Sequence, residues 1–327
     1  MREEEAAKEQ RAGPPGEERR GLPAALWAAA GVVVAAALFL WLRPIFAGTA
    51  SVSPILVQIG PLAVRWYGLL IAGSFIPGYY LARGYAARLG VDADTLVNFA
   101  VVVAVAGFIG ARIGFVVQNL GYYAQHPLDA LATWQGGLSI HGALVAGVLA
   151  AWLFSRRLPG RVGLWGMLDV AMPSVLLGQA IGRWGNFFNQ ELYGYPTSLP
   201  WKMYIAPEHR VPGYENVAFY HPTFLYESLW DAAGAALLFW YRGRRSARRG
   251  DELWLYLVVY SIGRFWVEFF RMGGTVIAGL TLAQWVSLLL IAAGAAGWIW
   301  NRRRPPEAEE SGEEASLRAG GGDPCAG

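Results

Sequence analysis

The chain has 327 residues, of which 55% are hydrophobic and 16% are charged, against about 25% charged residues in an ordinary soluble domain. The charge is uneven, because 21 of the 51 charged side chains lie in the first 21 and the last 27 residues. These values exclude a disordered, highly charged interaction protein and argue against a soluble globule. The net charge is only +3, and no basic block is interleaved with aromatic residues, so we expect no nucleic-acid partner.

The single cysteine, Cys325, lies in the polar C-terminal segment. It permits no internal disulfide, and no Cys/His spacing indicates zinc. We therefore expect no zinc site.

Runs of about 20 mostly apolar residues predict membrane-spanning helices. Eight candidates follow one another along the chain, and the fourth is short: 24–42, 66–83, 96–118, 141–155, 163–181, 223–241, 253–270 and 281–300. The first is either a retained anchor helix or a signal peptide. We favour the anchor, because its 19 residues exceed a typical signal-peptide core and no small-residue cleavage site follows.

Basic residues predict the orientation of these helices, because cytoplasmic loops carry the excess of Lys and Arg. With a cytoplasmic N-terminus, the inward loops receive Arg83 and Arg88, then Arg156, Arg157 and Arg161, and then a run of arginines over 242–249. This pattern places both termini in the cytoplasm and a long loop, 182–222, on the outside. Residues 1–21 and 301–327 are typical of solvated, disordered tails.

Ionisable side chains inside spans are costly and by default mark function. In the span 253–270 and just after it, Tyr260, Arg264, Glu268 and Arg271 recur at steps of four, four and three, which places them on one helical face. Two interpretations remain open. One is a structural Arg264–Glu268 ion pair, and the other is a polar cavity that binds an anion, for which guanidinium offers a bidentate fork.

A second polar cluster is GRWGNFFNQELYG at 182–194. Arg183 and Asn186 are three residues apart and can face one site, and the glycines permit a sharp turn or a close approach to a ligand. The alternative is a polar loop without a ligand.

Three weaker clusters complete the set: GGLSIHG at 136–142, HPTFLYE at 221–227 and RWYG at 65–68. His141 is either functional or an interfacial cap. Glu227 enters a span with Asp231 four residues later, so that one carboxyl is protonated or a buried Arg neutralises the pair. Under the predicted orientation all five clusters lie toward the outer side, which favours a single polar cavity at the outer leaflet.

This cavity would hold arginines, histidines, amides, tyrosines and a carboxylate, without a nucleophilic cysteine, a GxSxG serine or an HExxH metal pair. We expect Arg to bind a lipid phosphate and His to act as a general base for a second substrate that is itself the nucleophile. The alternative is a membrane transporter or channel for an anionic solute, which would place its ligand groups near the midplane. An intramembrane protease would need a Ser/His, paired Asp or metal set, which the sequence does not offer.

The motifs GRWGNFFNQELYG, GGLSIHGAL, HPTFLYE and RWYGL, with the Tyr260/Arg264/Glu268/Arg271 stripe, resemble the prolipoprotein diacylglyceryl transferase family from about residue 53 to 300. Of these, the 182–194 motif is the most specific. The chain departs from the family at Ala143, where a second Gly is usual, and at Phe224, where Gln is usual. The helix at 24–42 looks additional to the family's seven spans.

The resemblance implies an all-α polytopic bacterial inner-membrane enzyme with its active site toward the outer leaflet. It implies transfer of the diacylglyceryl group of phosphatidylglycerol to the lipobox cysteine of a prolipoprotein signal peptide, with release of glycerol phosphate. It also implies that the reaction needs no metal and no soluble cofactor. We expect a disordered tail over 1–21, an extra helix over 22–45, a catalytic membrane domain over 46–300 and a tail over 301–327. The catalytic candidates are His141, Arg183 and Arg264; the substrate-binding candidates are Arg183, Asn186, Glu191, Gly194, Tyr67, Tyr260, Glu268 and His221.

Overall fold

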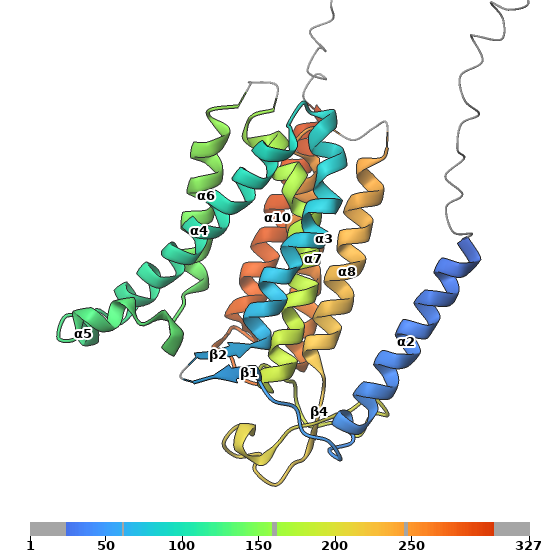
Figure 1. The fold of residues 1–327 in the computed structure, drawn as a ribbon, viewed down its shortest axis with the longest axis vertical. Helices are drawn as coiled ribbons and strands as arrows, with labels where there is room; N and C mark the ends of the chain where they lie inside the picture. Colours follow the sequence, from blue (N-terminus) through green and yellow to red (C-terminus); the bar gives the residue numbers. More distant parts are fainter. Residues whose placement is uncertain (1–23, 61, 159–161, 245–247, 304–327) are drawn as a thin grey trace, which may run out of the picture. The chain divides into compact units, whose positions relative to one another are not determined.

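The computed structural model describes residues 24–60, 62–158, 162–244 and 248–303 (Figure 1). The expected tail over 1–21 lies outside these residues, as does the expected C-terminal tail after residue 303. The chain divides into two units, Met1–Ser51 and Val52–Gly327. In the first unit the described element is helix α2 (Ala24–Phe46). The second unit contains all the other described elements and every candidate site residue.

The second unit is built mainly from helices, with a described helix in each range that the sequence predicts to span a membrane. These are α3 (Trp66–Arg88), α4 (Ala93–Gln118), α5 (Leu120–Tyr123), α6 (Ile140–Ser155), α7 (Gly163–Asn189), α8 (Thr223–Arg242), α9 (Asp251–Val267) and α10 (Leu282–Arg303). Short 3₁₀ turns lie at Pro127–Leu131, Thr133–Gln135, Pro207–His209 and Glu268–Phe270. Among the described helices, four are long and apolar enough to cross a membrane: α4, α7, Asp251–Phe270 and α10.

Three short antiparallel strand pairs accompany the helices, and the sequence analysis predicted none of them. They are β1 (Ile55–Ile59) with β2 (Leu62–Arg65), β3 (Met203–Tyr204) with β4 (Phe219–Tyr220), and β5 (Val276–Ile277) with β6 (Leu280–Thr281). The β5–β6 turn has positive φ at Ala278 (49°) and Gly279 (82°), as a two-residue hairpin requires. The strands β3 to β6 have two residues each, which is too short for a detectable alternating pattern.

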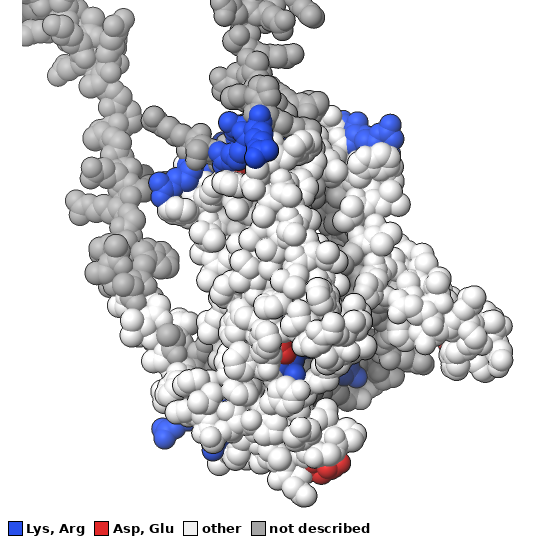
Figure 2. Space-filling view, turned by 180° about the vertical axis from the view of Figure 1, so that it is seen from behind, with Lys and Arg blue, Asp and Glu red and all other residues white. Residues whose placement is uncertain are grey.

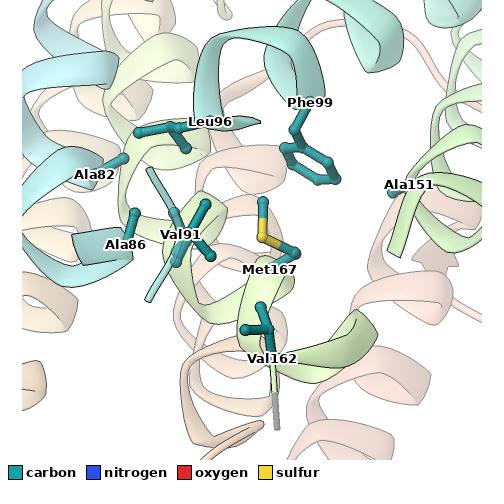
Figure 3. Packing of buried hydrophobic residues seen from close by; sticks show 9 residues of the cluster. Ala82, Ala86, Val91, Leu96, Phe99, Ala151, Val162 and Met167 are labelled. Atoms are coloured by element: carbon teal, nitrogen blue, oxygen red, sulfur yellow. The ribbon is translucent and has the colours of Figure 1, made fainter. Parts of the chain in front are cut away.

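Helix α7 is the centre of the bundle, because it packs against α3, α8 and α9, while α10 packs against α9. At the end of the bundle that holds Arg88, a hydrophobic cluster joins α3, α4, α6 and α7 (Figure 3). Met167 of α7 is fully buried there, near Leu96 and Phe99 of α4. Away from this cluster, α4 and α6 diverge together from α3 and α7 (Figure 1).

Helices α4 and α6 approach each other through glycines. A Cβ atom added to Gly114 would lie 2.9 Å from the Cα of Gly142, and one added to Gly110 would lie 2.6 Å from the Gly142 carbonyl oxygen. Such small-residue contacts are typical of helices that associate in lipid, because packing and not the hydrophobic effect holds them together.

Charged side chains gather at the ends of the bundle and leave an almost uncharged band between them (Figure 2). At the end with the hydrophobic cluster, basic residues lie at the C-terminal ends of four helices: Arg88 on α3, Arg156 just after α6, Arg242 on α8, and Arg302 and Arg303 on α10. The Arg183 end of α7 lies at the opposite end of the bundle.

Candidate functional site

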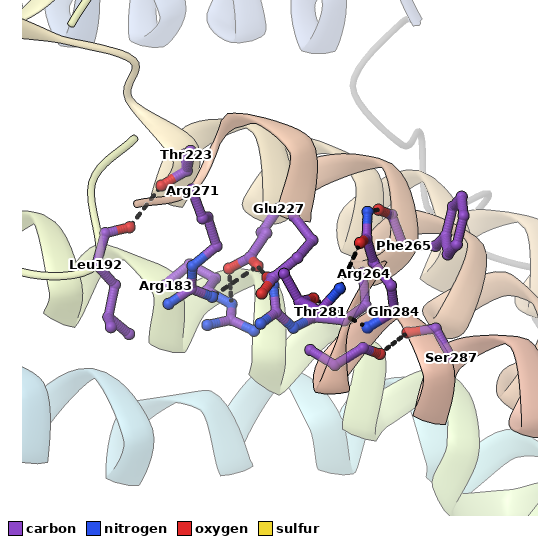
Figure 4. A network of polar contacts seen from close by, with 12 residues as sticks. Arg183, Leu192, Thr223, Glu227, Arg264, Phe265, Arg271, Thr281, Gln284 and Ser287 are labelled. Carbon is purple, nitrogen blue, oxygen red and sulfur yellow. Dashed lines mark hydrogen bonds and ion pairs between the residues drawn. The ribbon is translucent and has the colours of Figure 1, made fainter. Parts of the chain in front are cut away.

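Three arginines from three segments surround one buried carboxylate, that of Glu227 on α8 (Figure 4). Arg183 of α7 places Nε 2.8 Å from Glu227 Oε2. Arg264 of α9 and Arg271, which follows the 3₁₀ turn Glu268–Phe270 in extended conformation, place Nη1 at 3.4 and 3.3 Å from Glu227 Oε1. Glu227 is only 6% exposed, so this carboxylate is neutralised by arginines, one of the two alternatives that the sequence left open. We call these residues, with Glu268, the arginine cluster.

Glu268 supplies the second carboxylate of the cluster. Its Oε2 lies 2.5 Å from Nη1 of Arg264, four residues earlier, so the ion pair that was one of the two open interpretations is present. Because Arg264 also reaches Glu227, this pair belongs to a larger network and is not an isolated structural bridge. Within the cluster, three guanidinium groups outnumber the two carboxylates that pair with them.

Helix α7 extends farther than predicted and includes the first part of the most specific sequence motif, 182–194. The sequence analysis ended this helix at 181 and began a loop at 182, but the helix continues to Asn189. Gly182 and Gly185 do not form a turn; Cβ atoms at these positions would collide with Ile71 and with the ring of Tyr67 on α3. These glycines therefore let α3 and α7 pack closely, and the helix holds Arg183 rigidly toward α8.

The end of α7 is fixed by its own amide side chains. Asn186 Nδ2 and Asn189 Nδ2 both donate to Glu191 Oε1, at 2.8 and 3.1 Å. Gln190, the residue after the helix, adopts the left-handed conformation (φ 50°) that ends it. Asn186 and Glu191 thus shape the turn that follows Arg183.

Gly194 brings this turn against the segment that carries Arg271. Gly194 and Arg271 form an antiparallel bridge, and Tyr195 N donates to Phe270 O at 2.7 Å. A Cβ at Gly194 would collide with the Phe270 carbonyl oxygen. The predicted site glycine therefore acts through packing, because its missing side chain allows Arg271 to enter the cluster.

His221 supports the same turn. Its carbonyl oxygen accepts a hydrogen bond from Gly194 N at 2.9 Å, and its Nδ1 lies 3.0 Å from the Tyr226 hydroxyl. The ring packs against Phe270, with centroids 5.1 Å apart. Burial lowers the pKa of His221 below its ordinary value. From this position, His221 holds the turn at Gly194 against the segment that leads to Arg271.

The remaining predicted residues lie at different distances from the arginine cluster. Tyr260 of α9 lies within electrostatic range of Arg183 and Arg264 and stacks on Tyr256. Tyr67 lies on the opposite side of α7, over Gly185. His141 is exposed in the first turn of α6, and among the described residues no hydrogen bond or ion pair joins it to the cluster.

Two buried charged groups were not named as site residues from the sequence. Neutralisation of Glu227 by a buried Arg was one of two alternatives, but its partners could not be identified because they come from distant segments. Arg112 on α4 is 8% exposed. The feature of the sequence that could have identified it is that it is a single charged residue within an otherwise apolar predicted span.

A second ion-pair network, at the opposite end, was also missed. Arg242 makes a bidentate contact with Glu252 at 2.8 and 2.7 Å. The buried Asp169 carboxylate accepts from Gly250 N and Glu252 N at 2.5 and 3.1 Å, so it caps the N-terminus of α9. This network joins α7, α8 and α9 structurally, far from the arginine cluster.

Comparisons with known proteins agree with the motifs. The family model described as prolipoprotein diacylglyceryl transferase matches residues 54–300. A phosphatidylglycerol–prolipoprotein diacylglyceryl transferase of Nostoc sp. is 44% identical over 275 residues, covering 80% of this chain and 96% of the relative. Those of Gloeobacter violaceus and Fervidobacterium nodosum are 44% and 40% identical, covering 81% and 82% of this chain and 99% and 92% of the relatives.

The matched range begins just before β1 and ends within α10, so it contains the whole arginine cluster and His141. The α2 unit lies before it. The chain therefore belongs to the prolipoprotein diacylglyceryl transferase family.

Proposed function

We propose that the protein transfers the diacylglyceryl group of phosphatidylglycerol to the thiol of the lipobox cysteine in a prolipoprotein signal peptide. The cysteine sulfur, as thiolate, attacks the diacylglyceryl carbon that carries the phosphate. A carbon–sulfur bond forms, the carbon–oxygen bond to phosphate breaks, and glycerol phosphate leaves. The reaction needs no redox partner, because nothing is oxidised or reduced.

The observation that carries this proposal is the convergence of Arg183, Arg264 and Arg271 on one buried carboxylate. Because the guanidinium groups outnumber the carboxylates paired with them, the cluster is suited to an additional anion. A phosphodiester head group supplies one negative charge and accepts bidentate hydrogen bonds from guanidinium.

The same arginines favour the chemical step. Cleavage turns the phosphodiester into a phosphate monoester, whose second ionisation has a pKa of about 6, so negative charge grows on the leaving group. Donors that already point at this charge lower the barrier without reorganising. The rigid placement of Arg183 on α7, and the pairing of Arg264 with Glu268, provide this preorganisation.

We assign the proton transfer to His141. A free thiol has a pKa of about 8.5, so only a few per cent is thiolate near pH 7. An imidazole, which ordinarily titrates near pH 6.5, is suited to remove that proton. The exposed ring of His141 at the first turn of α6 leaves access for a substrate thiol.

The proposed setting is the bacterial inner membrane, crossed by seven family-like helices and by the additional α2. The arginines that close α3, α6, α8 and α10 at one end of the bundle support a cytoplasmic location for that end. Both termini are then cytoplasmic, and the arginine cluster faces the outer leaflet, where the lipid head group and the exported prolipoprotein meet.

The test is transfer by the purified protein in vesicles that contain phosphatidylglycerol, with a peptide that carries a lipobox cysteine. Mass spectrometry is expected to detect a thioether-linked diacylglyceryl peptide together with free glycerol phosphate. A Cys→Ser peptide and vesicles of phosphatidylcholine alone are the matched controls. A folded protein that yields no product under these conditions would contradict the proposal. Movement of an anion across sealed vesicles without peptide modification would instead support the transporter alternative.

A further inference from the structure

Arg112 is a buried cation that binds main-chain carbonyl groups. Its Nε donates to Ala130 O at 2.8 Å and its Nη2 to Asp129 O at 2.6 Å. Its Nη1 donates to the carbonyl oxygens of both Gly136 and Gly137 at 2.8 Å. Four hydrogen bonds from one guanidinium thus gather two stretches of the segment between α4 and α6, and the second stretch begins the GGLSIHG motif.

The other contacts of this motif bind it to the same face of α4. Ser139 N donates to Ala111 O at 2.9 Å, and Gln118 Nε2 donates to Ser139 Oγ at 2.6 Å. Gly137, with φ +79°, leaves no room for a Cβ beside the Phe115 ring and the Arg112 guanidinium. The backbone is therefore fixed from Gly136 to Ser139, two residues before His141.

The chemistry of this contact is specific to arginine. Among the described residues, Arg112 forms no ion pair with a carboxylate; neutral carbonyl groups and the rings of Phe115 and Tyr123 surround it. Burying a charge within a helix that is apolar enough to cross a membrane is costly. A planar group with five N–H donors is needed to satisfy four carbonyls in different directions, and the three donors of lysine are too few.

We propose that Arg112 is a positioning residue, which holds the Asp129–Gly137 turn and thereby sets the place of His141 at the start of α6. The inference rests on the proposed role of His141 in proton transfer. Arg112 itself touches no substrate; it acts through the backbone that it binds.

A double-mutant cycle tests whether the two residues act together. Transfer rates are measured for the full-length protein and its Arg112→Gln, Arg112→Lys, His141→Gln and Arg112→Gln/His141→Gln variants. We expect Arg112→Gln to lower kcat by about tenfold or more with little change in KM for the lipid, and Arg112→Lys to recover part of the loss. In the His141→Gln background, Arg112→Gln is expected to cost less than about threefold. Arg83→Gln, which removes an exposed arginine elsewhere, is the matched control.

Two outcomes overturn the inference. One is an Arg112→Gln protein that transfers at the wild-type rate. The other is a double variant whose loss equals the product of the two single losses, since the residues then act independently. If Arg112→Gln does not accumulate in the membrane, the cycle is run with Arg112→Lys, under the same two criteria.

A second measurement needs no turnover. The rate at which diethylpyrocarbonate modifies His141 is followed by mass spectrometry, with His209 and His221 of the same chain as internal references. We expect the relative rate at His141 to change in both Arg112 variants and to stay constant in Arg83→Gln. An unchanged rate contradicts the inference even if the protein transfers no lipid, whereas a changed rate without wild-type transfer contradicts only the proposed function.

Discussion

Glu227 organises the site by giving three guanidinium groups a common partner. Without it, Arg183, Arg264 and Arg271 would repel one another in a region of low dielectric constant. The sequence predicted Arg183, Arg264 and Glu268 as site residues from local spacing and motif resemblance. It did not predict the position of Glu227, because that position depends on how three helices pack and not on any spacing within one of them.

Replacing Arg183 or Arg264 with Lys is expected to lower kcat/KM by about ten- to hundredfold, somewhat less than the loss from removing a transition-state donor outright. Lys keeps the charge but lacks the planar fork that holds two oxygens. Steady-state transfer assays check the expectation, with Arg83→Lys as the control. Full turnover in both variants would rule out bidentate phosphate binding.

His141→Gln is expected to lower the transfer rate at neutral pH by about 10²–10⁴-fold if His141 is the general base. Raising the pH should restore much of the rate, because the substrate thiol then ionises unaided. If His141 only positions the lipid, the loss should appear in apparent lipid affinity and persist at high pH. Near-normal activity at neutral pH would assign His141 to neither role.

His221 is expected to make the protein less stable in acid. Burial lowers its pKa, so the unfolded chain, in which histidine titrates near pH 6.5, binds the proton more readily than the folded protein. The free energy of unfolding therefore falls as the pH drops through about 6.5 toward the lowered value.

Thermal unfolding in detergent between pH 8 and pH 5 checks this expectation. The His221→Gln protein should lose less of its melting temperature on acidification than the unmodified protein. His209→Gln, which removes an exposed ring, should follow the unmodified protein, and identical acid dependence in all three would show that His221 is not responsible.

At the scale of elements, the glycine contact between α4 and α6 sets how closely the two helices approach. The sequence predicted both helices from their apolar length. It could not indicate that α7 continues to Asn189 or that Asp169 caps α9. Both depend on partners that are distant in the chain: Tyr67 for the first and Gly250 for the second.

Gly110→Ala is expected to destabilise the protein by about 1–3 kcal/mol, the usual cost of forcing an extra methyl group into a packed contact. Its Cβ would meet Ala146 and the Gly142 carbonyl group. Gly107→Ala on the same helix is the matched control, since its nearest neighbour would be Ala143 O at 3.7 Å. Equal melting temperatures for the two variants would show that the helices are not held by this contact.

At the scale of the whole chain, the family match leaves out the unit that contains α2. Composition and span length predicted a helix there. The absence of family motifs in it indicated that this helix is additional to the family's seven spans. A protein that lacks residues 1–45 is expected to transfer at the full rate per inserted molecule, because every residue of the arginine cluster lies after Val52. Loss of activity at equal membrane abundance would assign the α2 unit a part in the reaction.

The order of the cluster residues along the chain also has a consequence for biogenesis. Arg183, Glu227, Arg264 and Arg271 enter the membrane in that sequence, so a nascent chain that has inserted only α3 to α8 holds Glu227 with a single arginine partner. The arginine cluster is complete only after α9 and the segment that follows it have emerged from the ribosome. The carboxylate of Asp251, at the start of α9, then accepts a hydrogen bond from Asn301 and forms an ion pair with Arg302, both on the last described helix. The proposed lipid-binding site thus forms late in synthesis, when most of the helices already lie in the bilayer.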